Sequence, residues 1–205
     1  DQPVRLGLLA AAGTAPEQWG ITNRNADFYD LKGDLEALFA PQVLGFEAAE
    51  HPALHPGRSA KVMADGKLIG YIGEIHPKWV QKYELGTAPV VCEVDVNAVL
   101  ATNLPVYTAI SRQPAVVRDM ALVVANSVAS MSLMAALKQV ARAIVRDIQL
   151  FDVYQGKGVD PDKKSLAFRV LMQDTQRTLE DAEVDAAVSA LVQCAEAQFN
   201  ATLRR

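Results

Sequence analysis

The sequence predicts an α+β protein with two modules, an antiparallel sheet with a helix followed by a βαββαβ unit. In the first half, strand patterns flank Asp65-Gly66, a strong signal for a β-hairpin. In the second half, strand and helix patterns follow one another in the order β, α, β, β, α, β. Between the halves, residues 101–114 show neither the helical nor the strand spacing of apolar residues, and they contain Pro105 and Pro114. We therefore expect one domain over residues 1–106 and another over 112–205.

Composition allows a folded core and narrows the class of protein. The chain has 205 residues, of which 50% are hydrophobic and 21% charged. No run of 18 apolar residues predicts a membrane span, and the first residues lack the pattern of a signal peptide. Because no initiator Met is present, we expect a piece of a longer chain. Cys92 and Cys194 lie in apolar segments, which predicts buried free thiols and a reducing, cytoplasmic location.

Charge is distributed unevenly along the chain. Residues 1–107 hold 8 Lys and Arg against 13 Asp and Glu, and residues 108–205 hold 12 against 11. Strong binding to a nucleic-acid backbone usually requires a clearly basic surface. Charge alone therefore argues against DNA or RNA binding in the first half and does not indicate it in the second.

The elements of the first half follow from the spacing of apolar residues and from the residues that begin or end helices and turns. Residues 4–10 read as a strand. Residues 27–40 read as a helix that begins near Asp27 and Asp30, carries Phe28, Leu31, Leu35 and Leu38 on its apolar face, and ends before Pro41. Residues 60–64 and 67–75 form the predicted hairpin, and residues 90–96 alternate as another strand.

The second half predicts strands at 118–124, 147–154, 165–172 and 201–204. Helices are predicted at 130–144 and 178–199, the second opening with a capping box from Thr178 to Asp181. This order is the ferredoxin-like arrangement, in which both helices cover one face of a four-stranded antiparallel sheet. The other face is then free of helices.

Alternation along each strand predicts which side chains lie on that open face. Leu166, Phe168, Val170 and Met172 should face the helices. Phe151 and Val153 should do the same, although Ile148 and Leu150 share the parity of Asp152. The side chains left on the open face are Ala121, Asp152, Tyr154, Ser165, Arg169 and Arg204. A ring, a carboxylate, a hydroxyl, a small residue and cations suit unstacked bases, but a merely solvated face fits the same pattern.

Other motifs carry little chemistry. The sequence shows no catalytic constellation, so we expect no catalytic residues. We also expect no metal site, because His51 and His55 each precede a proline that disfavours a helical ligand pair. Gly70 and Gly73 should mark close backbone packing. His55 and Arg58, in "HPGRSA", fit either a structural turn at a subunit interface or an anion-binding loop. Arg118 and Asp119 are interpreted as a local ion pair near the sheet edge.

Eight ordered segments resemble one family. "DFYDLKGDLEALF", "LHPGRSAKV", "IGYIGEIHP", "RQPAVVRDMALVV", "LFDVYQGKGV", "KKSLAFRVLMQ", "RTLEDAEV" and "ATLR" are similar, in order and spacing, to the C-terminal part of the β subunit of bacterial phenylalanyl-tRNA synthetases. The resemblance implies that residues 1–106 are part of a class II synthetase-like domain without a working active site. It implies that residues 112–205 are a ferredoxin-fold anticodon-binding domain.

The resemblance also implies a function and partners. The parent enzyme would be a phenylalanine–tRNA ligase, an (αβ)₂ assembly in the cytoplasm that uses ATP and magnesium, with its catalytic site in the α subunit and no cofactor in this fragment. By motif position, the family's contacts to the tRNA-Phe anticodon would fall on Ala121, Asp152, Tyr154 and Ser165. Arg169 and Arg204 are added from parity alone. No DNA or membrane partner is implied.

Two other functions remain open from the residues. A βαββαβ unit can serve as a regulatory module that binds a small ligand. An enzyme in which Arg58 holds a phosphate group is a further alternative.

Overall fold

The computed structural model describes residues 2–101, 105–107 and 109–204. The chain forms two compact units, Asp1–Tyr107 and Thr108–Arg205, and each has its own buried hydrophobic core. Among the described residues, no helix is long and apolar enough to cross a membrane.

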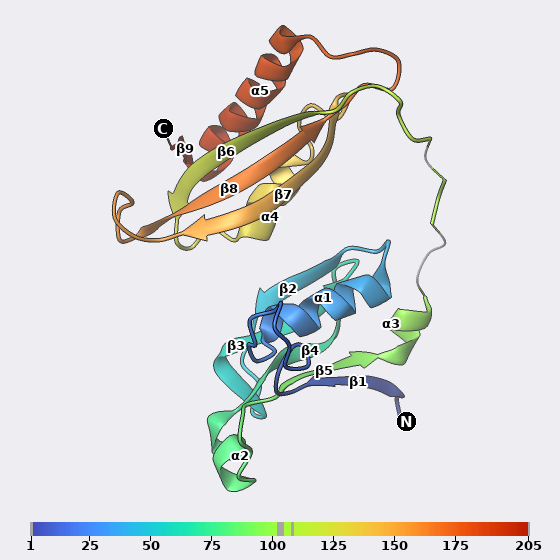
Figure 1. Cartoon of the computed structure of the whole chain (residues 1–205), viewed down its shortest axis with the longest axis vertical. Helices are drawn as coiled ribbons and strands as arrows, with labels where there is room; N and C mark the ends of the chain where they lie inside the picture. Colours follow the sequence, from blue (N-terminus) through green and yellow to red (C-terminus); the bar gives the residue numbers. More distant parts are fainter. Residues whose placement is uncertain (1, 102–104, 108, 205) are drawn as a thin grey trace. The chain divides into compact units, whose positions relative to one another are not determined.

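The N-terminal unit is built on a five-stranded antiparallel sheet (Figure 1). Its strands are β1 (Arg5–Ala10), β2 (Leu44–Ala48), β3 (Leu54–Ala64), β4 (Lys67–Ile75) and β5 (Val90–Asp95), in the order β1-β5-β4-β3-β2. The predicted strands are confirmed. Sequence patterns did not single out β2 or the short helices α2 (Pro77–Lys82) and α3 (Val96–Leu100).

Helix α1 (Phe28–Phe39) lies across one face of this sheet and buries Leu31, Leu35 and Phe39 (Figure 1). The expected Leu38 is 42% exposed, and Phe39 occupies the core in its place. The reason is helical geometry: Leu35 and Phe39 are four residues apart and share a face, whereas Leu38 is rotated toward solvent.

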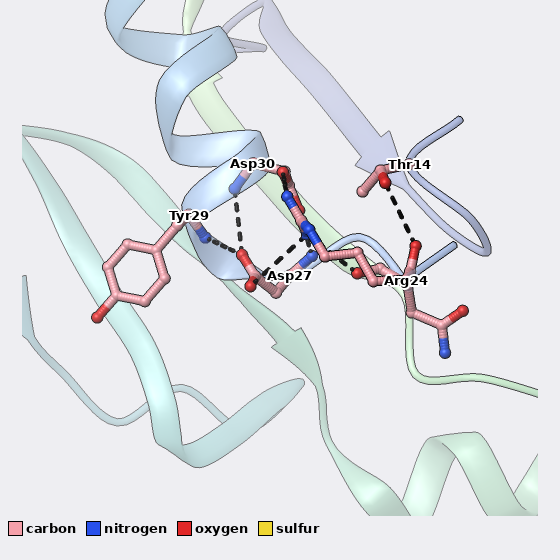
Figure 2. Close-up of polar contacts among 6 residues, drawn as sticks. Thr14, Arg24, Asp27, Tyr29 and Asp30 are labelled. Atoms are coloured by element: carbon pink, nitrogen blue, oxygen red, sulfur yellow. Dashed lines mark hydrogen bonds and ion pairs between the residues drawn. The ribbon is translucent and has the colours of Figure 1, made fainter. Parts of the chain in front are cut away.

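The start of α1 is held by reciprocal hydrogen bonds, which Figure 2 shows. The Asp27 carboxylate accepts from the backbone N–H of Tyr29 at 2.7 Å, and the Asp30 carboxylate accepts from the N–H of Asp27 at 2.8 Å. Arg24 donates to both oxygens of Asp30, at 2.6 and 2.7 Å. This capping box satisfies N–H groups that have no partner within the helix. The predicted position of the helix start is confirmed.

Gly70 and Gly73 allow β4 to approach both of its neighbours. A Cβ on Gly70 would lie 2.0 Å from the carbonyl oxygen of Glu93 in β5, and one on Gly73 would lie 2.7 Å from the carbonyl oxygen of Arg58 in β3. The expected close packing at these glycines is confirmed. The hairpin is confirmed too, since Asp65 and Gly66 both have positive φ, 48° and 74°.

The C-terminal unit contains β6 (Val116–Ala125), α4 (Ser130–Leu137), β7 (Val145–Tyr154), β8 (Lys163–Met172), α5 (Asp181–Phe199) and β9 (Thr202–Leu203). The strand order is β7-β8-β6-β9, and every pairing is antiparallel. Helices α4 and α5 share one core with β6 and β8 and lie on the same side of the sheet (Figure 1). The predicted ferredoxin-like fold is confirmed.

Two predicted helix boundaries are wrong. Helix α4 ends at Leu137 rather than at 144, and Ala141 has a φ of 50°, which a right-handed helix does not contain. Val140 and Ile144 still pack on the core from this irregular turn. Helix α5 begins at Asp181, so the capping pair is Glu180 and Glu183 rather than Thr178 and Asp181.

The two thiols differ in burial. Cys92 is 3% exposed, and burial raises its pKa to about 12. Cys194 is only partly buried on α5, so the prediction of a buried free thiol is confirmed for Cys92 alone.

Candidate nucleic-acid interface

The alternation of side chains in β8 and β6 decides which residues lie on the face of the second sheet away from α4 and α5. Leu166, Phe168, Val170 and Met172 are each no more than 1% exposed and face the helices, as predicted. On β6, Met120, Leu122 and Val124 do the same. We call the opposite side the open face; it carries Asp119, Ala121, Val123, Gln149, Phe151, Asp152, Tyr154, Ser165, Ala167 and Arg169, with Arg204 just after β9.

A β-bulge in β7 changes which residues reach the open face. Leu150 pairs with Phe168 and Asp152 with Ala167, so Phe151 is an extra residue opposite β8. A bulge shifts the alternation by one position. Ile148 and Leu150 therefore face the core before the bulge, while Asp152 and Tyr154 face away from it after the bulge.

The expectation that Phe151 packs in the core is wrong for the same reason. Its side chain is 52% exposed, and its ring lies 5.1 Å from the guanidinium carbon of Arg169, which belongs to the open face. Val153, also expected in the core, pairs with the core residue Leu166 but remains 54% exposed near the strand end.

Small side chains form the centre of the open face. Asp152 of β7, Ala167 of β8 and Ala121 of β6 lie in one row across three strands. The two alanines are half-buried, and Asp152 is exposed. The two alanines raise no large side chain above the backbone, and Asp152 places a carboxylate at the edge of the sheet. Arg204 continues this row, because its N–H donates to the Ala121 carbonyl oxygen at 2.8 Å, and its side chain reaches across the open face to Tyr154.

Tyr154 lies in the next row, and its position is fixed by two contacts. Its hydroxyl donates to the carbonyl oxygen of Lys157 at 3.1 Å. Gly156 makes this possible, since a Cβ there would lie 2.8 Å from the Tyr154 hydroxyl. The guanidinium carbon of Arg204 lies 4.8 Å from the ring centre. The ring is thus held over the open face and carries a cation on one side.

Ser165 is on the open face but is only 3% exposed. It pairs with Tyr154 on one side and Val123 on the other. Arg204 reaches Tyr154 from the opposite edge of the sheet, so these two long side chains meet over the open face.

Arg169 is paired with Asp119, not left free. Its Nε and an Nη donate to the two carboxylate oxygens of Asp119 at 2.9 and 2.8 Å. These hydrogen bonds lower the pKa of Asp119 and raise that of Arg169. The predicted ion pair of Arg118 with Asp119 is wrong, because neighbours in a strand point to opposite faces. A guanidinium nitrogen of Arg118 instead lies 4.0 Å from a carboxylate oxygen of Asp181.

The structure brings together all six residues predicted for the open face. Ala121, Asp152, Tyr154, Ser165, Arg169 and Arg204 come from strands or strand ends of one sheet. Sequence alternation missed Phe151. The signal that could have revealed it was the conflict between Leu150 and Asp152, which only a bulge resolves.

The other predicted pair lies in the N-terminal unit, at the start of β3. The Nδ1 atom of His55 accepts a hydrogen bond from the N–H of Gly57 at 3.0 Å, which shapes the turn. Arg58 donates to both carboxylate oxygens of Glu74, at 2.8 and 3.0 Å. This pairing offsets the charge of Arg58, and its role at an interface or anion site remains a prediction.

Comparison with known proteins assigns each unit. Residues 111–204 match the model of the ferredoxin-fold anticodon binding domain, and residues 1–96 match the phenylalanyl tRNA synthetase beta chain CLM domain. The C-terminal unit is therefore a domain of the anticodon-binding class. The chain as a whole belongs to the family of phenylalanine–tRNA ligase beta subunits.

Curated proteins with that name align with nearly the whole chain. The beta subunit of Aromatoleum aromaticum is 59% identical over 100% of this chain, and that of Dechloromonas aromatica is 57% identical over 99%. The beta subunit of Neisseria meningitidis is 43% identical over 96%. This chain covers 26%, 26% and 25% of the three relatives, so it spans about a quarter of their length.

Proposed function

We propose that this chain is the tRNA-binding C-terminal part of a phenylalanine–tRNA ligase beta subunit, and that its open face receives the anticodon of tRNA-Phe. The observation that carries the proposal is the row Asp152–Ala167–Ala121 beside the fixed ring of Tyr154, on a helix-free face of a unit that matches an anticodon-binding model.

Each residue of this face has a chemical role in the proposal. The Tyr154 ring stacks on an unstacked base, and the Asp152 carboxylate accepts a hydrogen bond from an exocyclic amine. Ala121 and Ala167 allow the base to approach the sheet. Ser165 adds a hydroxyl. Arg204 leaves the ring and turns its guanidinium to a phosphate.

The N-terminal unit serves subunit assembly in this proposal. Several large side chains of the unit are exposed: Leu9 is 67%, Tyr29 76% and Tyr83 63% accessible. Apolar side chains in such number suit a surface that another chain or segment covers. The partner would be the alpha subunit within an (αβ)₂ enzyme of the cytoplasm. ATP and magnesium would act at sites outside this chain. We propose that this chain by itself is non-catalytic.

The test is a titration of a labelled tRNA-Phe anticodon stem-loop into the chain, with a non-cognate loop as control. Tyr154→Ala and Asp152→Ala should each weaken binding of the cognate loop, Tyr154→Ala by roughly 1–3 kcal/mol. Val153→Ala is the matched control, because it lies between the two on the other face of β7. Unchanged affinity in both open-face variants would contradict the proposed site. A small-ligand module would instead respond to amino acids and ignore the RNA.

A further inference from the structure

Phe151 is a large apolar ring that neither core contains. It lies at the β7 bulge, on the open face, and is 52% exposed. We propose that Phe151 and Arg169 form a second base-stacking platform beside Tyr154, so that the open face holds two unstacked bases of one RNA loop. This inference rests on the proposed function and adds a second base site to it.

The bulge places the platform on the same face as Asp152 and Tyr154. Without the bulge, Ile148, Leu150, Asp152 and Tyr154 would all face the helices, because they lie at alternate positions. Phe151 would face away from the core in either case. With the bulge, Phe151, Asp152 and Tyr154 all reach the same face. A bulge leaves one residue unpaired and re-aims its side chain. The arrangement therefore places a ring on each side of one carboxylate.

Arg169 holds the platform in place. Its guanidinium is fixed by two hydrogen bonds to Asp119, at 2.9 and 2.8 Å, while its central carbon lies 5.1 Å from the centre of the Phe151 ring. Asp119 offsets the positive charge of Arg169. Aromatic rings and guanidinium planes both stack on bases. A pair with its charge already offset suits the flat face of a base better than a phosphate.

The spacing favours two bases over one. Because the bulge takes up one residue, Phe151 and Tyr154 are separated by two to three residues of extended strand, which corresponds to roughly 7–10 Å along the sheet. Each ring also has its own arginine, Arg169 for Phe151 and Arg204 for Tyr154. Asp152 between them can accept a hydrogen bond from a base on either ring. We therefore assign one base to each ring.

The experiment combines protein variants with altered RNA. The full chain is titrated with a labelled anticodon stem-loop, intact or with one anticodon base at a time replaced by an abasic residue. Phe151→Ala and Phe151→Leu should both weaken binding of the intact loop, by about 5- to 150-fold for the alanine, because neither offers a π face. Phe151→Tyr should keep the affinity, and Val153→Ala should leave it unchanged. Thermal unfolding confirms that each variant folds.

Each ring should have its own abasic position at which removing that ring no longer lowers the affinity, and the two positions should differ. Phe151→Ala should cause no further loss with one abasic loop, and Tyr154→Ala should cause none with another. If Tyr154→Ala weakens binding and Phe151→Ala does not, the second platform is wrong and the proposed function stands. If neither weakens binding, the proposed site is wrong as well. If one abasic position cancels both, a single base spans the rings and the two-base inference is overturned.

Discussion

The guanidinium carbon of Arg204 lies 4.8 Å from the centre of the Tyr154 ring, although the two residues belong to opposite edges of the sheet. Tyr154 ends β7 and Arg204 follows β9, and these are the outer strands in the order β7-β8-β6-β9. The pair therefore spans the open face from one edge of the sheet to the other. An RNA base that stacks on Tyr154 competes with Arg204 or uses the other side of the ring.

Replacing Tyr154 with Phe separates stacking from hydrogen bonding. The variant keeps the ring and loses the hydrogen bond to the Lys157 carbonyl, so its affinity for the anticodon stem-loop should stay close to that of the wild type. Its unfolding free energy should fall by no more than about 1 kcal/mol, because the lost bond lies at the surface. Equilibrium binding and denaturant unfolding measure the two effects. A loss of affinity equal to that of Tyr154→Ala would show that the hydroxyl, not the ring, matters.

The two arginines should differ in the salt dependence of RNA binding. Arg204 makes no ion pair with a carboxylate among the described residues, so Arg204→Gln should reduce the slope of log affinity against log salt by about 1. The double variant Asp119→Asn with Arg169→Gln removes a charge-neutral pair and should leave the slope unchanged. Titrations at several salt concentrations test this. Equal slopes for Arg204→Gln and the wild type would contradict a phosphate contact by Arg204.

Acid should remove the stabilisation that Glu183 provides at the start of α5. Hydrogen bonds from Arg177 and from the Glu180 N–H lower the pKa of Glu183 from 4.5 to about 2. A lowered pKa in the folded state adds stability that is present at pH 7 and is lost as the pH falls from about 4.5 through about 2.

The thermal midpoints of Glu183→Gln and the wild type should therefore differ at pH 7 and converge near pH 2. Glu196→Gln is the control, because this exposed residue lies on the same helix and has no ion pair with a described residue. A difference that stays constant across this pH range would rule out the linkage.

Two glycines should respond oppositely to substitution by alanine. A Cβ on Gly70 would lie 2.0 Å from the Glu93 carbonyl oxygen, so Gly70→Ala should separate β4 from β5 and cost about 1–3 kcal/mol or more. At Gly33, exposed on α1, a Cβ meets nothing within 4 Å. Gly33→Ala should stabilise the chain by about 0.5–1 kcal/mol through helix propensity. Denaturant unfolding of both variants checks the signs.

Local pattern predicted most of the fold, because the elements that matter have clear periods and ends. The Asp65-Gly66 turn, the alternating β8 and the start of α1 at Asp27 all depend on nearby residues. Prediction was wrong where tertiary packing decides. The chain leaves the helix after Leu137 although Ile144 continues the apolar period, because the core also accepts Ile144 from an irregular turn.

The sequence by itself determined the βαββαβ order and the chemical character of the open face, since alternation in β6 and β8 is uninterrupted. Only the tertiary structure decided the position of the β7 bulge, because a bulge is a property of the register between two strands. That register placed Asp152 and Tyr154 on the same face as Phe151. It also took pairing across strands to join Arg169 to Asp119 and Arg204 to Tyr154, contacts between residues far apart in the chain.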